Sequence, residues 1–408
     1  MTNYHIHTLQ SGLKIAVKPE KCLVTYMGFA VRAGTRDESK SSYGLAHLVE
    51  HMLFKGTSKR TSTHIINRAE EVGAELNAYT TKEETFIYAA LPCQYWKRIF
   101  RLLSDIVLNS RFPEEELSKE KTVIIDEINS YKDSPSEFIY DEFENMIFDK
   151  TPLGHNILGS ERSINHISAK MARDFMRKYY RPDNMIFFIN GDINETELIK
   201  LANQIFGNTH PEDPISHIPI DEHCYTPTHK RRRRDTYQYH VMMGSRAYSM
   251  HQPERIGLSL LLNILGGPGM NSKLNMALRE HNGLVYNVES SYTAYSDGGM
   301  LAIYYACARE NAEKAEHLVK QEFDKLIAHP ISEEELLAAK RQVKGQLMIA
   351  EDSRENATLS FAKSILHYGK QDSLERVLQR IDSLTAKDLH SLATAKLKME
   401  DMTTLTYI

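Results

Sequence analysis

The chain contains the stretch Gly44-Leu45-Ala46-His47-Leu48-Val49-Glu50-His51-Met52-Leu53, and the stretch Gly257-Leu258-Ser259-Leu260-Leu261-Leu262-Asn263-Ile264-Leu265-Gly266 aligns with it at an offset of 213. Both stretches are predicted to be helical. A strand-like run precedes each of them, from Leu23 to Arg32 in the first half and from Thr236 to Arg246 in the second. The repeated order indicates an internal duplication.

Two further matches follow in the same order. Gly73-x-x-x-Asn77 aligns with Gly283-x-x-x-Asn287 at an offset of 210, and Glu114-Glu115-Glu116-Leu117 aligns with Glu333-Glu334-Glu335-Leu336 at an offset of 219. Ordered matches with slowly drifting offsets are typical of a duplicated domain with small insertions. We therefore predict an α+β fold with two homologous domains, each a mostly antiparallel sheet with helices packed on one side.

The predicted domains span residues 1–215 and 236–408, and a linker at 216–235 joins them. The boundary is placed in the polar stretch from about Gly207 to Arg234 because this stretch contains four prolines. The linker includes the basic run Lys230-Arg231-Arg232-Arg233-Arg234. We interpret this run as solvated chain, with a docking patch for an anionic partner as the alternative.

Composition narrows the classes of protein. The chain has 408 residues, of which 41% are hydrophobic and 25% charged, with a net charge of -4. This balance argues against a disordered chain and against a nucleic-acid or membrane-surface binder. The four cysteines are far apart, and no apolar run of membrane-spanning length occurs. A cytoplasmic location is expected.

The first copy of the repeated helix carries groups suited to metal chemistry. His47 and His51 are four residues apart, so a helix places both imidazoles on one face, where they can bind a single ion. Glu50 lies beside them in the sequence. A hydrolytic zinc site usually takes three protein ligands and leaves one position for water, so a third ligand is required.

The helix expected from Ser118 to Tyr131 offers candidates for that ligand. Glu120 and Glu127 are seven residues apart and interrupt one apolar stripe of this helix. A carboxylate on such a face is costly to bury unless a cation accompanies it. Solvent exposure of both glutamates is the alternative.

Comparison of the two copies groups these residues. The second copy lacks the imidazole and carboxylate groups found in the first at His47, Glu50, His51, Glu120 and Glu127. The aligned second-copy residues are Leu260, Asn263, Ile264, Ala339 and Gln346. The simplest interpretation is that the first-copy residues form one site, although a chance histidine pair on a structural helix is the alternative.

These residues resemble the pitrilysin or insulinase family of zinc peptidases, in which the zinc motif is His-x-x-Glu-His. The resemblance implies a metalloendopeptidase with one Zn²⁺ per chain, bound by His47, His51 and, at the family's spacing from the second histidine, Glu127. It also implies that Glu50 is the general base and that Glu120 supports catalysis. The chain resembles half-length members, among them the β subunit of mitochondrial processing peptidase and small bacterial peptidases.

The resemblance extends to residues that would bind substrate. The segment Asn77-Ala78-Tyr79-Thr80 resembles the family's substrate-binding edge strand, where an extended peptide adds to the sheet. An ordinary hairpin strand is the alternative. Arg279 and Tyr286 match the family's pair that holds the substrate carbonyl, and Asn282-Gly283 between them reads as a helix C-cap. The glycine-rich loop at 266–272 departs from the usual form at Pro268, so no substrate role is predicted for it.

Full-length members of the family have four such domains that form a closed chamber, whereas this chain has two. A homodimer is therefore expected, in which Arg279 and Tyr286 complete the active site of the partner chain. The expected ligands of this chamber are peptides, with neither nucleic acid nor membrane as a partner. The alternatives are a non-catalytic scaffold subunit and a peptide-binding partner of an active paralogue.

Overall fold

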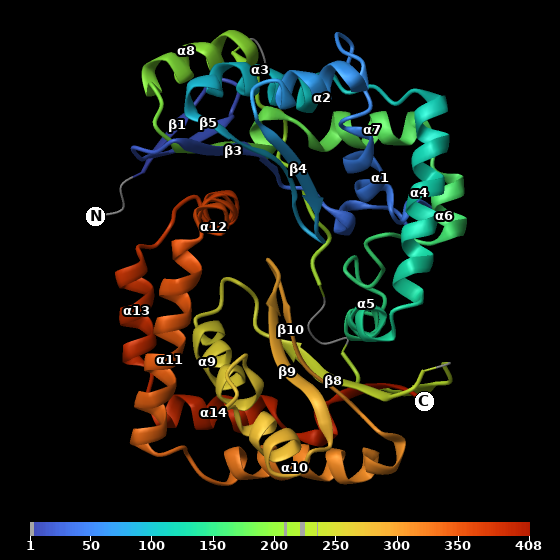
Figure 1. The fold of residues 1–408 in the computed structure, drawn as a ribbon, viewed down its shortest axis with the longest axis vertical. Coiled ribbons are helices and arrows are strands. Elements are labelled where there is room, and N and C mark those ends of the chain that lie inside the picture. The colour runs from blue at the N-terminus through green and yellow to red at the C-terminus, as the bar shows by residue number, and fades with distance from the viewer. Residues whose placement is uncertain (1–3, 208–209, 221–224, 235) are drawn as a thin grey trace. The chain divides into compact units, whose positions relative to one another are not determined.

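The computed structural model describes residues 4–207, 210–220, 225–234 and 236–408, and these residues form two compact units (Figure 1). The first unit combines the chain up to Asn129 with Asn156–Ile218 and Ala350–Ser373. The second combines Ser130–His155, Pro219–Ile349 and the chain from Leu374 onward. Each unit therefore contains segments from both halves of the sequence.

The first unit is built on a six-stranded sheet with the order β1-β2-β6-β3-β5-β4, in which only β2 and β6 are parallel neighbours. Its strands are β1 (His5–Thr8), β2 (Lys14–Pro19), β3 (Val24–Val31), β4 (Glu75–Thr80), β5 (Thr85–Pro92) and β6 (Met185–Gly191). Its helices are α1 (Leu45–Met52), α2 (Ser62–Glu70), α3 (Trp96–Asn109), α4 (Glu114–Lys132, whose last residues belong to the second unit), α6 (Glu161–His166), α7 (Ala169–Tyr179), α8 (Glu195–Phe206) and α12 (Arg354–Tyr368).

Both faces of this sheet are buried. Because successive side chains of a strand point to opposite faces, Phe29 of β3 joins the core beneath α3, where its ring lies 6.4 Å from that of Phe100. Ala30, the next residue, joins a separate core that includes Phe361 and Ile365 of α12. Figure 1 shows α12 on the side of the sheet opposite to α3 and α8.

The second unit is built on a five-stranded sheet with the order β7-β11-β8-β10-β9, in which only β7 and β11 are parallel neighbours. Its strands are β7 (His229–Arg232), β8 (Tyr239–Ala247), β9 (Val285–Ala294), β10 (Gly299–Cys307) and β11 (Thr403–Tyr407). Its helices are α5 (Pro135–Ile147), α9 (Glu254–Gly266), a π-helical segment (Asn275–Glu280), α10 (Ala312–Ala328), α11 (Glu333–Asp352, whose last residues belong to the first unit), α13 (Leu374–Ser383) and α14 (Ala386–Lys396).

The two sheets confirm the predicted fold class. The order β2-β6-β3-β5-β4 of the first sheet recurs as β7-β11-β8-β10-β9 in the second, with the parallel pair in the same place. The aligned Gly73 and Gly283 both have positive φ, +68° and +60°, directly before β4 and β9. This conformation is readily accessible to glycine, which explains why both copies keep it there.

The helix packing departs from the prediction in one respect. Most helices of each unit cover one face of its sheet, but α12 lies on the opposite face of the first sheet and α5 contacts β8 and β11 of the second. The contiguous ranges 1–215 and 236–408 stay our prediction for the duplicated halves. The predicted linker at 216–235 includes residues 221–224 and 235, which lie outside the described residues, and it also contains β7.

Within the described ranges, no helix combines the length and the apolar character needed to cross a membrane.

A buried carboxylate joins α12 to the first sheet. Glu84, at the end of the β4–β5 connection, is 2% exposed and accepts hydrogen bonds from Lys363 Nζ at 2.5 Å and from His367 Nε2 at 2.8 Å. Burial alone would raise the pKa of Glu84, but the bond from His367 and the charge of Lys363 outweigh it and lower the pKa to about 2.

Glu84→Gln is expected to lower the free energy of unfolding at pH 7 by about 2 kcal/mol, because it removes the charge that strengthens the hydrogen bonds from the buried His367 and the half-exposed Lys363. The pKa of Glu84 lies below the ordinary value of 4.5, so this stabilisation is present above that pH and is lost as the pH falls toward 2. Denaturant unfolding at several pH values measures both effects. Glu70→Gln, at an exposed position of α2, is the control, and equal stability of the two variants at pH 7 would contradict the assignment.

Candidate metal centre

The helix that carries the His-x-x-Glu-His motif is fixed at its start by a buried carboxylate. Gly44, with a φ of +93°, is the N-cap of α1, and the Glu38 carboxylate accepts hydrogen bonds from the backbone N–H groups of Gly44 at 2.9 Å and Ala46 at 2.6 Å. These N–H groups have no partner within the helix, so Glu38 supplies one. Burial raises the pKa of Glu38 well above its usual range, against these bonds. No sequence pattern singled out this residue.

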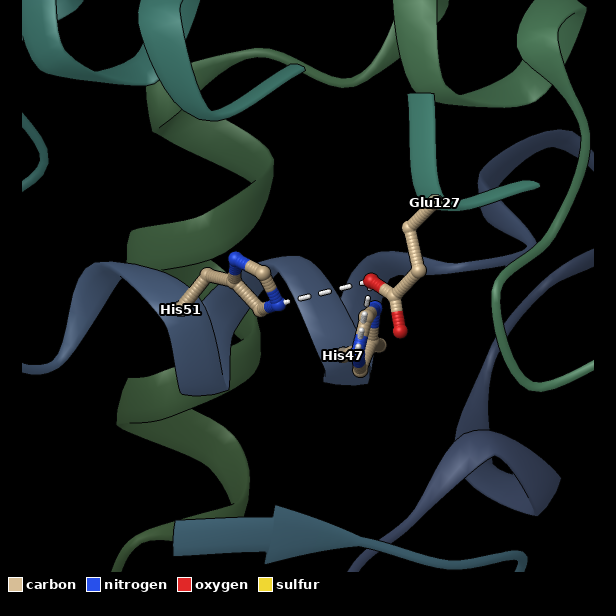
Figure 2. Close-up of side chains that lie close together, drawn as sticks. All are labelled: His47, His51 and Glu127. Carbon is tan, nitrogen blue, oxygen red and sulfur yellow. Dashed lines mark ion pairs between the residues drawn. The ribbon is translucent and has the colours of Figure 1, made fainter. Parts of the chain in front are cut away.

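Three potential ligand atoms converge beside α1. Figure 2 shows the Glu127 side chain reaching toward both imidazole rings. Glu127 Oε2 lies 3.8 Å from His47 Nε2 and 3.8 Å from His51 Nε2, and the three ligand atoms all lie within 4.8 Å of one another. Among the described residues, this is the group of histidine, cysteine and acidic side chains with the convergence that a metal site requires.

The chemistry of this group fits a zinc ion. Two imidazole nitrogens and one carboxylate oxygen form a typical donor set of a hydrolytic zinc site, with room for a fourth ligand. The 3.8 Å separations are too long for hydrogen bonds, so the atoms converge without saturating one another. Burial, together with the nearby His51, lowers the pKa of His47 to about 3, so its ring is neutral at pH 7, as a metal ligand must be.

Glu120 contacts the other nitrogen of His51. Its Oε2 lies 3.0 Å from His51 Nδ1, its Oε1 lies 2.6 Å from Lys55 Nζ, and the residue is only 7% exposed. A carboxylate at Nδ1 holds the proton there and leaves the Nε2 lone pair facing Glu127. The structure thus places Glu120 behind a candidate ligand, and solvation of this residue is excluded. The sequence patterns did not identify Lys55, because its partner Glu120 is distant in the sequence.

Glu120→Gln is expected to weaken zinc binding by about tenfold, since outer-shell partners of metal-bound histidines contribute on this scale. Titration of the metal-free protein with zinc against a competing chelator measures the change. Glu115→Gln, an exposed position on the same helix, should bind zinc as the unaltered chain does. Equal affinities for both variants would show that Glu120 does not orient His51.

Glu50 lies near the candidate ligands and near Thr80 of the edge strand. Burial raises the pKa of Glu50, while the nearby His51 and hydrogen bonds from the hydroxyl and backbone N–H of Thr80 oppose the shift. A carboxylate with a raised pKa is suited to accept and return a proton. Thr80, predicted from the sequence only as a substrate-binding residue, therefore also contacts the predicted base.

The predicted substrate strand lies at the end of the first sheet. β4 contains Asn77, Ala78, Tyr79 and Thr80 and pairs with β5 alone among the described strands. An edge strand of this kind can accept another strand along its open side. The ring of Tyr79 stacks on Phe86 at 4.9 Å, so this side chain packs against the sheet and is not directed at the open edge. The substrate role of these residues stays a prediction.

Arg279 and Tyr286 lie together in the second unit. The guanidinium of Arg279 is 5.9 Å from the centre of the Tyr286 ring, and Tyr286 is 84% exposed. The π-helical segment that holds Arg279 ends at Glu280, and Gly283 then leads into β9, as the predicted C-cap required. This pair is therefore accessible to a ligand of the second unit.

The degenerate copy of the site keeps its geometry. Asn263 of α9 and Gln346 of α11 align with Glu50 and Glu127, and Asn263 Nδ2 donates a hydrogen bond to Gln346 Oε1 at 2.9 Å. The aligned helices thus meet at the same point in both copies. In the second copy, a neutral hydrogen-bonded pair therefore stands where the first copy has Glu50 and Glu127.

Two family models match successive parts of the chain. Residues 15–161 match the family model described as insulinase (peptidase family M16), and residues 166–343 match the model described as peptidase M16 inactive domain. A protein from Rickettsia bellii named as an uncharacterized zinc protease is 30% identical over 95% of this chain and 93% of its own length. A Bacillus subtilis protein with the same description is 28% identical over 95% and 94%.

Solved structures show the same fold. A protease from Helicobacter pylori superposes with a TM-score of 0.89 over 100% of this chain and 99% of its own, at 20% identity. A structure described as a peptidase M16 inactive domain from Pseudomonas fluorescens gives a TM-score of 0.90 over 99% and 98%, also at 20% identity. At these identities the likeness concerns the fold.

Proposed function

The chain belongs to the insulinase family of peptidases (family M16), and on that premise we propose that it is a zinc-dependent endopeptidase acting on extended peptides or unfolded segments. The observation that carries the proposal is the convergence of His47 Nε2, His51 Nε2 and the Glu127 carboxylate in one group, with Glu50 beside it. One zinc ion per chain would be bound by these ligands.

The description of the second half as an inactive domain is compatible with this proposal. The match to that description covers residues 166–343, where Leu260 and Ile264 stand at the positions aligned with His47 and His51. The candidate ligands all lie within residues 15–161, which match the other family model. Loss of the site in one copy therefore does not remove it from the other.

Different residues of the chain would have different roles in peptide hydrolysis. A bound zinc ion would supply Lewis acidity toward the substrate carbonyl and lower the pKa of water to about 7. The Glu50 carboxylate, which lies near Thr80, takes the proton of the attacking water and passes it to the leaving amine. β4 holds the substrate backbone by strand addition, with little demand on the substrate's side chains.

We assign the stabilisation of the negative charge that develops on the substrate's carbonyl oxygen to residues of a second copy of the chain. The phenol of Tyr286, supported by Arg279, would donate a hydrogen bond to the carbonyl oxygen as negative charge develops there. The proposal thus requires a homodimer in which each Arg279–Tyr286 pair serves the partner's metal site. The exposure of Tyr286 supports this role, since its hydroxyl is available to a ligand.

A mixture of two inactive variants tests this arrangement. Glu50→Gln and Tyr286→Phe are each expected to lose activity, and co-refolding equal amounts should restore roughly a quarter of the unaltered activity, because half of the dimers would contain one intact site out of two. Glu50→Gln mixed with the double variant Glu50→Gln/Tyr286→Phe is the control, since no combination of these chains carries the base. A mixture as inactive as its components would contradict completion by the partner chain.

Peptide hydrolysis tests the function itself. The purified chain should cleave unstructured peptides, followed by mass spectrometry, and leave a stably folded protein of similar sequence content intact, because only an extended backbone can pair with β4. Absence of cleavage across a peptide library by a zinc-loaded chain would favour the scaffold or peptide-binding alternatives.

A further inference from the structure

The basic run of the sequence forms the open edge of the second sheet. β7 (His229–Arg232) is the terminal strand of that sheet and pairs only with β11 among the described strands. The positively charged residues Lys230 to Arg234 occupy this strand and the two positions that follow it. Most of the run is exposed. A run of five consecutive cations is unusual in a chain with a net charge of -4.

Among the described residues, the backbone of β7 has a partner strand on one side only. Thr404 N–H donates to Thr228 O at 2.8 Å, and Ile408 N–H donates to Arg232 O at 3.0 Å, so the even-numbered residues of β7 face β11. In a parallel pair, the N–H and C=O of one residue point to the same side. The backbone groups of His229 and Arg231, and of Arg233 just beyond the strand, therefore point away from the sheet.

The side chains of the run fall into two classes. Arg232 forms an ion pair with Glu142 of α5, and the guanidinium of Arg234 lies 4.5 Å from the ring of Phe138 and 5.0 Å from that of Tyr407. These two arginines attach the strand to its own unit. Lys230, Arg231 and Arg233 are exposed and have no acidic partner among the described residues. Arg231 and Arg233 thus combine unpaired charge with outward backbone groups.

We propose that the β7 edge is a docking site for an extended, acidic segment of another polypeptide, which adds to the second sheet as a further strand. Backbone hydrogen bonds from His229, Arg231 and Arg233 would hold the segment, and its carboxylates would face Lys230, Arg231 and Arg233. The site lies outside the proposed catalytic residues and goes beyond the proposed function.

Charge and geometry select this occupant. A second copy of β7 is disfavoured because two runs of cations would face each other. Nucleic acid would use the charges but has no use for a row of outward N–H and C=O groups, and no aromatic residue is interleaved in the run. An alternative explanation of the basic run is that charged edge strands protect sheets from aggregation. Protection of the edge would need only a few charges, and it predicts no affinity for an acidic strand.

Binding of a fluorescent peptide to the full chain tests the proposal. The probe is a ten-residue peptide of alternating glutamate and threonine, followed by anisotropy, and all proteins carry Glu50→Gln so that the peptide stays uncut. The double variant Arg231→Gln/Arg233→Gln should bind about tenfold more weakly, because two of the three unpaired charges are removed. The matched control is Lys170→Gln/Arg173→Gln, which removes two exposed charges from α7 and should change binding less than twofold.

A second probe separates strand addition from charge attraction. A peptide with the same side chains but a methyl group on every backbone nitrogen should bind at least about tenfold more weakly, because it cannot donate to β7. The proposal would be overturned by equal binding of the two peptides, by equal binding to the arginine variant and the control, or by tighter binding of a ten-nucleotide single-stranded RNA. A further result would also overturn it: none of the three proteins binds the peptide, and the arginine variant self-associates. The charges of β7 would then serve only to prevent aggregation at the sheet edge.

Discussion

Glu50→Gln is expected to reduce peptide hydrolysis at least about a hundredfold while zinc remains bound, because removal of a general base has this scale and Glu50 is not among the three candidate ligands. Glutamine keeps the shape of the side chain and can still accept a hydrogen bond from Thr80. It cannot take a proton from water. The expected loss therefore falls mainly on kcat, and steady-state kinetics together with metal analysis of the same sample measure it.

The control for this variant is Glu70→Gln, which makes the same chemical change at an exposed position of α2. It should leave kcat and zinc content as they are in the unaltered chain. If Glu50→Gln instead retains full activity, the base has been assigned to the wrong residue. If it loses zinc together with activity, Glu50 acts through the metal site and not as a base.

The second large effect is expected from the ligands themselves. His51→Ala should weaken zinc binding by more than the roughly 10- to 100-fold typical of outer-shell variants, since it removes one of three ligands and leaves Glu120 without its imidazole partner. Activity should disappear with the metal, even though Glu50 is intact. A zinc titration and a peptide assay on the same variant measure the two losses together.

His64→Ala on α2 is the matched control, because this histidine is exposed and lies outside the convergent group. It should bind one zinc ion as the unaltered chain does. Full activity of His51→Ala without bound zinc would contradict a metal-dependent mechanism. Retention of zinc with unchanged affinity would place the metal on other residues.

The residues of the candidate site could be proposed from the sequence because the chain contains two copies of one domain, which can be compared with each other. Two copies of a domain that differ at a handful of polar positions single out those positions, and the structure brings His47, His51 and Glu127 together from two separate helices. The aligned helices meet at the same point in both copies, as the Asn263–Gln346 hydrogen bond shows, so aligned positions of the two helices lie close together in each unit. The local pattern Asn282-Gly283 also predicted a helix C-cap, and Gly283 has the positive φ that favours glycine there.

Other features were beyond the reach of sequence patterns. α12 packs on the first sheet through Phe361 and Ile365, which no periodicity of the sheet's own half could indicate. The basic run was interpreted as solvated linker because its composition is polar. Its strand structure comes from β11, at the far end of the chain, which supplies the hydrogen bonds. In both cases a long-range contact overrides the local preference.

The same limit applies to the support of the metal site. Glu38 caps α1 from a preceding loop, and Lys55 pairs with Glu120 from beyond the end of α1. Neither spacing corresponds to a regular period of helix or strand. Buried charges of this kind become apparent only when their partners are located in space, whereas metal ligands follow a short and recognisable motif.

The most direct test of a zinc peptidase centred on His47, His51 and Glu127 is a titration of the metal-free, unaltered chain with zinc, with peptide cleavage measured at each step. We expect no cleavage without metal, a linear rise with added zinc, and a plateau at one ion per chain. Cleavage that persists in the metal-free chain, or that fails to appear after one equivalent of zinc has bound, would contradict the assignment.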